Sequence, residues 1–210
     1  LDPGDAFVST HYAAVEDLPV GARVGTSSLR RRAQLLAMRP DLTICDLRGN
    51  VNTRLAKLDA GEFDAIVLAA AGLKRLGFER RIRSILPRSV MLPAVGQGAL
   101  AIECRAGDAA ILSAIAFLRD AGMTTAAQAE RAFLRRVEGG CQIPVGVYAE
   151  VDADGQISID AMIASVDGQR ICRADAHGAG EQAEAIGTAL AEELLDAGGR
   201  EILKEIGITA

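Results

Sequence analysis

The stretch ARVGTSSLRRRAQLLAMRP, residues 22–40, contains a complete strand-to-helix unit and indicates the fold class. Residues 23–26 predict a short β-strand, and a Gly-Thr-Ser-Ser turn leads into a helix with apolar periodicity over about 28–39. Pro40 ends that helix, because proline lacks a backbone N–H and clashes with the preceding turn. A strand that runs directly into a helix is the first half of a βαβ unit.

The same alternation continues for two more units. LTICDLRGN predicts a second short strand, and VNTRLAKLDAG predicts a helix with Val51, Leu55 and Leu58 on one face. FDAIVLAAAGL, residues 63–73, is a continuous apolar run, as expected for a strand buried on both faces, and GLKRLGF begins another helix. Strands that alternate with helices at this spacing predict a mainly parallel α/β sheet.

The remainder of the chain has a different pattern. LPAVGQGALAIECRAG predicts a glycine-rich crossing followed by a strand over 99–104, and helices are predicted at about 108–118 and 124–137. Three β-runs beginning at Val145 are separated by the hairpin-type turns DADG and VDGQ, and an amphipathic helix follows them before two glycines. The sequence therefore predicts a small antiparallel α+β module after the α/β part.

These patterns divide the chain into three parts. We expect an α/β anion-binding lobe over 1–95, a crossing with the remnant of another lobe over 96–120, and an α+β domain over 121–210. The chain opens on LDPGDAFVST without an initiator methionine, and we expect it to be part of a longer protein. It has no apolar run as long as a bilayer span and no charged-then-apolar leader, which favours a cytoplasmic protein.

Positive charge is concentrated in the first lobe. Residues 23–88 contain 14 Lys and Arg against 6 Asp and Glu, whereas the rest of the chain contains 9 against 22. One interpretation is solvated helix faces, and the other is an anion-binding surface. The basic segment has only Phe63 and Phe78 as aromatic residues, so it lacks a stacking platform for nucleic acid. A small polyanionic ligand fits better.

Three strand-to-helix junctions supply the candidate anion-binding residues. The first has three hydroxyls at 26–28 before the arginines at 30–32, and free N–H groups at a helix start favour an anion. The alternative is that a serine only caps the helix and the arginines face solvent. The other two junctions add cations, and the carboxyl ends of parallel strands collect ligands. No P-loop glycine pattern is present, so carboxylates fit at least as well as phosphates. The added cations are Arg48, Arg54, Lys74 and Arg75.

The cysteines differ in their sequence context. They are Cys45, Cys104, Cys141 and Cys172. No C-x-x-C pair is present and neither histidine lies near a cysteine, so neither a metal site nor a disulfide framework is expected. Three of the thiols fall in predicted strands and are expected to be buried and inert. Cys141 follows a Gly-Gly turn, where the backbone can present a side chain, although the sequence supplies no neighbouring base.

Four blocks together resemble one enzyme family. VGTSSLRRRAQL, LRGNVNTRLAKLDAGEFDAIVLAAAGLKRLG, LPAVGQGALAIECR and EGGCQIPVGVYAEV, in this order, are similar to the porphobilinogen deaminases, also called hydroxymethylbilane synthases. The resemblance implies a transferase of tetrapyrrole (heme and porphyrin) biosynthesis. Such an enzyme joins four porphobilinogen molecules head to tail, releasing ammonia at each addition and finally hydroxymethylbilane.

The resemblance also implies a cofactor and its binding residues. A dipyrromethane would be bound by a thioether to Cys141, which then acts as an anchor, with no metal in the site. Gln97 would lie in the crossing at the cleft. The residues that would bind the carboxylates of cofactor and substrate are Thr26, Ser27, Ser28, Arg30, Arg31, Arg48, Arg54 and Arg75.

The fold implied by the resemblance is larger than this chain. It has two lobes like those of type II periplasmic binding proteins and a small third domain, and it is monomeric. The family's N-terminal lobe includes an H-S-x-K-D-x-P segment with the main catalytic aspartate, and this sequence lacks that segment. We therefore expect the 210 residues to be inactive alone. The alternative is a non-catalytic module that binds a small carboxylate.

Overall fold

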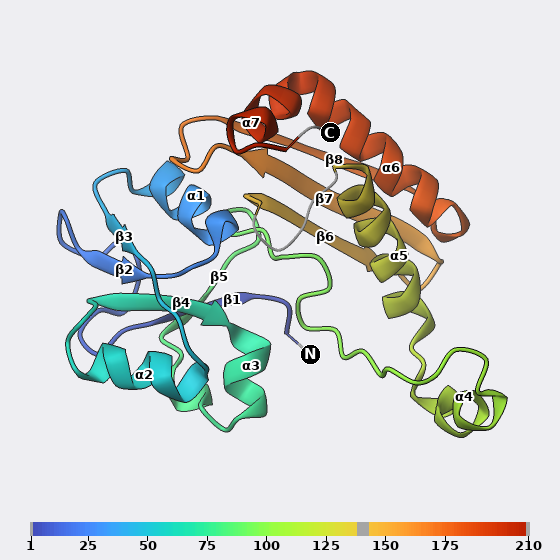
Figure 1. Ribbon diagram of the computed structural model, residues 1–210, viewed down its shortest axis with the longest axis horizontal. Coiled ribbons are helices and arrows are strands. Elements are labelled where there is room, and N and C mark those ends of the chain that lie inside the picture. Colours follow the sequence, from blue (N-terminus) through green and yellow to red (C-terminus); the bar gives the residue numbers. More distant parts are fainter. Residues whose placement is uncertain (1, 138–142, 209–210) are drawn as a thin grey trace.

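The computed structural model describes residues 2–137 and 143–208, and two β-sheets organise them (Figure 1). The first sheet has the strand order β3-β2-β4-β1-β5. β2 pairs in parallel with β3 and β4, whereas β1 is antiparallel to β4 and β5, so four strands point the same way. The mainly parallel sheet predicted from the sequence is confirmed. Its strands are β1 (Asp5–Val8), β2 (Arg23–Gly25), β3 (Thr43–Cys45), β4 (Ala65–Ala69) and β5 (Ser84–Leu86).

Three helices follow the parallel strands as the sequence predicts. They are α1 (Leu29–Met38), α2 (Val51–Asp59) and α3 (Ala70–Arg75). Ser28 and Asn50 cap the first two, because each side chain accepts a hydrogen bond from a free N–H in the first turn. The apolar run 63–73 is shared between β4 and α3, since an alanine-rich buried stretch does not mark where the strand ends. Apolar clusters cover both faces of the sheet.

The strand predicted over 99–104 is wrong. This segment is irregular, and Leu100 and Ile102 are 65% and 56% exposed. The residues that the structure describes place no sheet edge beside it, and a strand is stable only when its N–H and C=O groups find partners. The helix that follows, α4 (Ala109–Ile115), stands apart from both sheets and has no buried residue (Figure 1).

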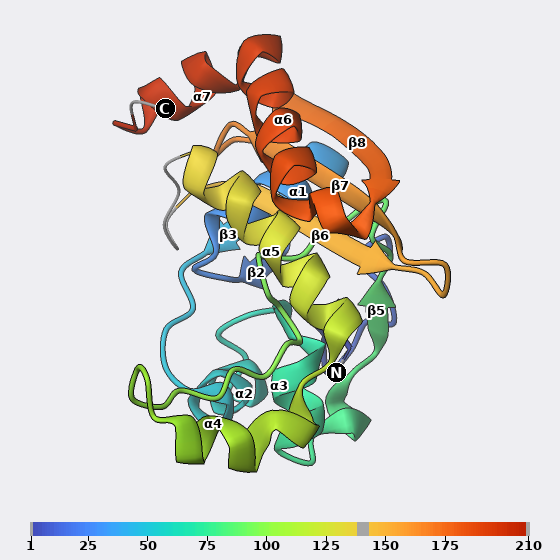
Figure 2. The ribbon, with the colours of Figure 1, turned by 90° about the vertical axis from the view of Figure 1, so that its right-hand side faces the viewer.

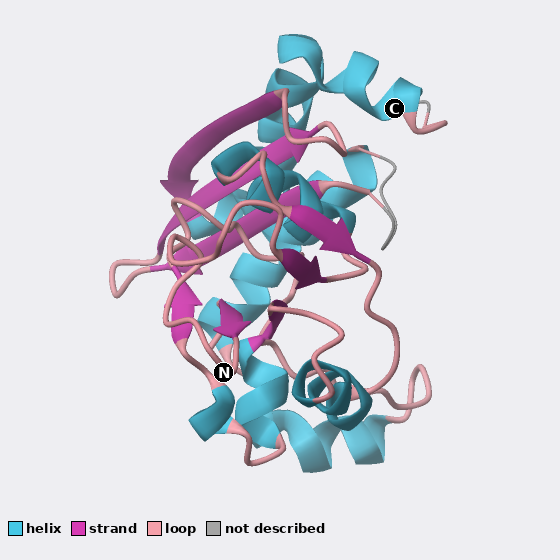
Figure 3. Cartoon of the chain, turned by 90° about the vertical axis from the view of Figure 1, so that its left-hand side faces the viewer, coloured by secondary structure: helices cyan, strands magenta, loops and turns pink. Residues whose placement is uncertain are grey.

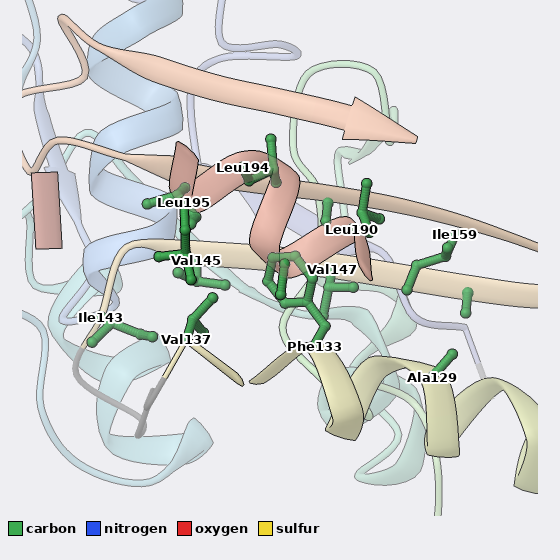
Figure 4. Packing of buried hydrophobic residues seen from close by; sticks show 14 of the residues in the cluster. Ala129, Phe133, Val137, Ile143, Val145, Val147, Ile159, Leu190, Leu194 and Leu195 are labelled. Atoms are coloured by element: carbon green, nitrogen blue, oxygen red, sulfur yellow. The ribbon is translucent and has the colours of Figure 1, made fainter. Parts of the chain in front are cut away.

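The second sheet forms the C-terminal domain. β6 (Val145–Val151), β7 (Gln156–Ala164) and β8 (Ile171–Ala179) are antiparallel neighbours, as the two hairpin turns predict. α5 (Ala121–Arg136) and α6 (Ala183–Leu194) cover one face, and α7 (Arg200–Glu205) closes the chain (Figure 2). α5 begins three residues before the prediction, because the Asp120 carboxylate caps it by accepting from Met123 N. The core is shown in Figure 4; its labelled residues include Phe133, Val147, Ile159, Leu190 and Leu194.

The other face of the second sheet packs on the first domain. Viewed from the side, the two sheets lie one above the other (Figure 3). Met162 and Ala164 of β7 contact Ala33 of α1 in a small buried cluster. Gly168, in the β7–β8 turn, lies so close to α1 that a Cβ atom there would be 2.3 Å from the Ala33 carbonyl oxygen. Because this contact excludes any side chain, the turn fits closely against α1, the helix whose start carries the predicted arginines.

Candidate anion-binding site

The hydroxyl groups of the turn before α1 accept hydrogen bonds from the protein's own backbone. Thr26 Oγ1 accepts a hydrogen bond from the Ser28 N–H at 3.2 Å, and Ser28 Oγ accepts from the Arg31 N–H. Ser27 Oγ accepts from the Leu47 N–H at 3.0 Å and so ties the turn to the chain after β3. The prediction that a serine caps this helix is confirmed. Each hydroxyl oxygen accepts a hydrogen bond from the protein, so it can contact an anion only by donating its own proton.

Arg30 and Arg31 are buried in an ion-pair cluster with Asp5. Asp5, on β1, is fully buried, and Arg30 Nη1 donates to its Oδ2 at 2.6 Å. Arg31 donates to Asp5 Oδ1 through both Nε, at 2.9 Å, and Nη2, at 2.7 Å. Burial alone would raise the Asp5 pKa, but the two guanidinium charges outweigh it and hold the pKa below its ordinary value. The interpretation that these two arginines face solvent is therefore wrong.

Gln97 joins the crossing to this cluster. Its side-chain amide donates to the Pro3 carbonyl at 2.6 Å and to Asp5 Oδ1 at 3.0 Å, while its Oε1 accepts from Arg30 Nη2 at 3.2 Å. The neighbouring Gly96 N–H donates to the buried carboxylate of Glu130 on α5, whose pKa is raised by burial. These contacts hold the crossing between β1, α1 and α5.

A cavity of about 180 Å³ lies beside the cluster. It has one polar side, made by Ser28 and Arg30, and an otherwise apolar wall. Arg30 Nε is buried and has no hydrogen-bond partner among the residues that the structure places. A buried guanidinium N–H without a partner is costly, and a carboxylate is the ligand that satisfies it best. The apolar wall is formed by Ala94, Val95, Leu134, Ile143 and Val145.

A larger hollow of about 380 Å³ lies elsewhere, on the exposed part of the second sheet. Glu150, Asp152 and His177 are among its lining residues. Its acidic lining disfavours a polycarboxylate ligand, because like charges repel. The smaller cavity at Arg30 is the better candidate.

The remaining predicted cations lie outside the cluster. Arg54 donates through Nε to the Gly49 carbonyl at 2.8 Å, and its pKa is lowered by burial and by the charge of Arg31. The Arg48 side chain is 84% exposed, with an Asp46 oxygen 3.9 Å away. Arg75 is exposed and borders a separate hollow with Gly98 and Leu100. The structure thus brings Ser28, Arg30, Arg31 and Gln97 together, places Arg54 near Arg31, and leaves Arg48 and Arg75 at the surface.

The structure contradicts the expected burial of three cysteines. Cys45, Cys104 and Cys172 are free thiols, but each is partly exposed, so the expectation of buried thiols is wrong. Cys45 ends an edge strand, and Cys104 lies in the irregular segment that forms no strand. Cys141 lies outside the described residues. In the described ranges, no group of His, Cys, Asp and Glu is suited to hold a metal ion.

Asp5 is the member of the arginine cluster that the sequence prediction missed. The signal for it is a lone carboxylate at the start of the apolar strand DAFV. A buried charge requires a partner, and the nearest excess of cations is the arginine run at 30–32.

Two family models match the chain. Residues 1–113 match the porphobilinogen deaminase, dipyromethane cofactor binding domain. Residues 124–196 match the porphobilinogen deaminase C-terminal domain. The chain belongs to the porphobilinogen deaminase family. Membership in the porphobilinogen deaminases places it in tetrapyrrole biosynthesis, with porphobilinogen as substrate and a dipyrromethane cofactor. None of the helices in the described ranges is long and apolar enough to span a membrane.

Proposed function

We propose that this chain is the cofactor-holding part of a hydroxymethylbilane-forming transferase. The reaction is the head-to-tail condensation of four porphobilinogen molecules, with loss of ammonia at each step. The observation that supports this function best concerns Arg30. Its guanidinium is buried beside a mostly apolar cavity, and its Nε has no hydrogen-bond partner among the described residues. Arg30 lies within the part of the chain that matches the cofactor-binding domain of the family, and the cavity wall also includes Leu134, Ile143 and Val145 from the part that matches the C-terminal domain.

The cavity residues fit the proposed group. A dipyrromethane combines flat apolar rings with carboxylate side groups, and the cavity combines apolar walls with one cationic edge. Ser28 and Arg30 would hold a carboxylate, Val95 and Leu134 would contact the rings, and Cys141 would carry the thioether. Ile143, the first described residue after the segment that contains Cys141, lines the same cavity. When bound, the group supplies a fixed pyrrole whose free α-position accepts the first porphobilinogen.

Proton transfer is not assigned to these residues. Among the residues that the structure describes, none of the side chains that line the cavity is a carboxylic acid. Asp5, the carboxylate nearest to Arg30 in the hydrogen-bond network, has a lowered pKa and stays ionised at neutral pH, so it cannot donate a proton. We therefore propose that the 210 residues bind the ligand but do not condense porphobilinogen. Formation of hydroxymethylbilane by the purified chain would contradict this.

A second candidate function is a non-catalytic carboxylate-binding module. The same arginine cluster favours it, because a cationic cavity wall accepts any small carboxylate of suitable size. Calorimetric titration of the Cys141→Ser chain, which would lack the attached group, separates the two functions. Porphobilinogen should bind more tightly than glutarate if the apolar wall contacts a pyrrole, whereas equal affinities would favour the simple module.

Arg48 provides a test of the outer part of the site. Because its side chain is largely exposed, Arg48→Ala is expected to leave stability unchanged. We expect it to weaken porphobilinogen binding about tenfold, since a hydrogen bond to a charged group contributes about 1.5–3 kcal/mol. Arg119→Ala, which removes another exposed arginine, is the matched control and should bind like the unchanged chain. Equal affinities in both variants would show that Arg48 is only a solvated surface residue.

A further inference from the structure

Each of the three guanidinium nitrogens of Arg31 has a hydrogen-bond partner within the protein. Its Nε and Nη2 both donate to Asp5 Oδ1, and its Nη1 donates to the Val67 carbonyl at 3.3 Å. Asp5 is completely buried and Arg31 nearly so. The Nε–Nη2 edge of Arg31 is therefore closed to a ligand, because a carboxylate of the protein already occupies it.

Arg30 differs from Arg31 in the edge it leaves open. Its Nη1 donates to Asp5 and to the Leu92 carbonyl, which fixes one side of the guanidinium. On the other side, Nε has no partner among the described residues, and Nη2 donates only to Gln97 at 3.2 Å. The Nε–Nη2 edge is one of the two edges that bind a carboxylate in a bidentate manner.

We propose that Asp5 is a positioning residue that gives the two arginines different roles. Arg31 becomes an internal counter-charge, and Arg30 presents its Nε–Nη2 edge to one carboxylate of the ligand. Gln97 Oε1 occupies part of that edge in the absence of ligand and is displaced when the carboxylate binds. The identity of the ligand as a pyrrole carboxylate rests on the proposed function; the division of roles does not.

Charge balance supports this arrangement. Two buried guanidinium groups and one carboxylate leave a single positive charge, which one ligand carboxylate neutralises. Gln97 is suited to move, because its amide nitrogen keeps its bonds to the Pro3 carbonyl and Asp5 when its oxygen leaves Arg30. No bond is made or broken in this step, and only hydrogen-bond partners are exchanged.

The test is Asp5→Asn, with Asp2→Asn as the matched control. Asp2 is also an aspartate paired with a cation, Lys74, but it is partly exposed and does not contact the arginines. Affinity for porphobilinogen and for glutarate is measured by calorimetry with every variant in a Cys141→Ser background, so that no covalently attached pyrrole occupies the Arg30 edge. If Asp5 only balanced charge, its neutralisation would tighten the binding of an anion. Since we assign it a positioning role, we expect affinity to fall about tenfold or more, with no change in Asp2→Asn.

A double variant separates positioning from folding. Asp5→Asn combined with Arg31→Gln restores the net charge of the cluster and removes the unpaired cation, so its urea midpoint should recover most of the loss seen in Asp5→Asn. We expect its affinity to stay low, because Arg30 has still lost Asp5. Affinity that recovers together with stability would overturn the positioning role. This variant also decides the question if Asp5→Asn alone does not fold.

The two ligands distinguish this proposal from the proposed function. Binding of glutarate but not porphobilinogen, with the expected loss in Asp5→Asn, would support the role of Asp5 and contradict the pyrrole ligand. Unchanged or tighter binding in Asp5→Asn overturns the role of Asp5 whichever ligand binds. If neither ligand binds the Cys141→Ser chain, both proposals fail, since Arg30 then presents no carboxylate-binding edge.

Discussion

Phe133→Ala is expected to lower the free energy of unfolding by about 3–5 kcal/mol. Phe133 lies on α5 with no exposed surface, and its ring packs in the core of the C-terminal domain with Val147, Ile159 and Leu190 (Figure 4). Truncation removes the buried ring and leaves a cavity that the surrounding helices and sheet fill only in part. Urea denaturation followed by circular dichroism measures the loss.

The matched control is Phe117→Ala. Phe117 is 82% exposed, so the same substitution is expected to change stability by no more than about 0.5 kcal/mol. A similar loss in both variants would mean that the exposed segment after α4 packs in solution, contrary to the structure. A small loss in Phe133→Ala would contradict the assignment of the C-terminal core. That core also supports the cavity, because Ile143 and Val145 belong to both.

Acidification is expected to remove the stability that Asp5 contributes. The folded-state pKa of Asp5 lies below the ordinary aspartate value of 3.8, because the Arg30 and Arg31 charges favour the carboxylate, so this contribution is complete above about pH 4. It is lost as the pH falls through the folded-state pKa, when protonation leaves two buried guanidinium groups without their partner. Loss of one partner of a buried ion pair costs about 3–5 kcal/mol, which makes this effect comparable to that of Phe133→Ala.

The measurement is the stability difference between the unchanged chain and Asp5→Asn from pH 7 down to pH 3. The difference should be large at pH 7 and narrow in acid, where the native carboxyl becomes neutral as well. The stability of the two chains must be compared at each pH, because Glu130 makes stability depend on pH in the opposite direction. Burial raises the Glu130 pKa, so its contribution is present in acid and is lost as the pH rises through the folded-state pKa. A difference that does not vary with pH would contradict an ionised Asp5 in the folded protein.

Much of the fold is predictable because its signals are local. The cap at Ser28, the stop at Pro40 and the hairpin turns between β6, β7 and β8 each act within a few residues. The positions of the helices are predictable for the same reason, because the spacing of apolar residues is a local pattern. The order β3-β2-β4-β1-β5 was not predicted, since the reversal of β1 depends on the pairing of distant segments.

The sequence predictions that the structure contradicts have non-local causes. The run 99–104 has the composition of a strand, but pairing requires a neighbouring edge, and the described part of the chain supplies none. At the site, the sequence identified the arginines but treated Arg30 and Arg31 alike. Their difference arises from Asp5, which is 26 residues from Arg31 and reaches it only through the sheet. Tertiary packing determines which side chains meet at such separations, and local sequence patterns do not predict these contacts.

The intact mass of the purified chain shows directly whether Cys141 carries a dipyrromethane. We expect a mass above that of the sequence by two linked pyrrole units, the same excess in Cys104→Ser, and no excess in Cys141→Ser. Cys104→Ser is the control because it removes a partly exposed thiol outside the proposed site. An unchanged chain with no added mass, or an adduct that persists in Cys141→Ser, would contradict Cys141 as the anchor of a dipyrromethane.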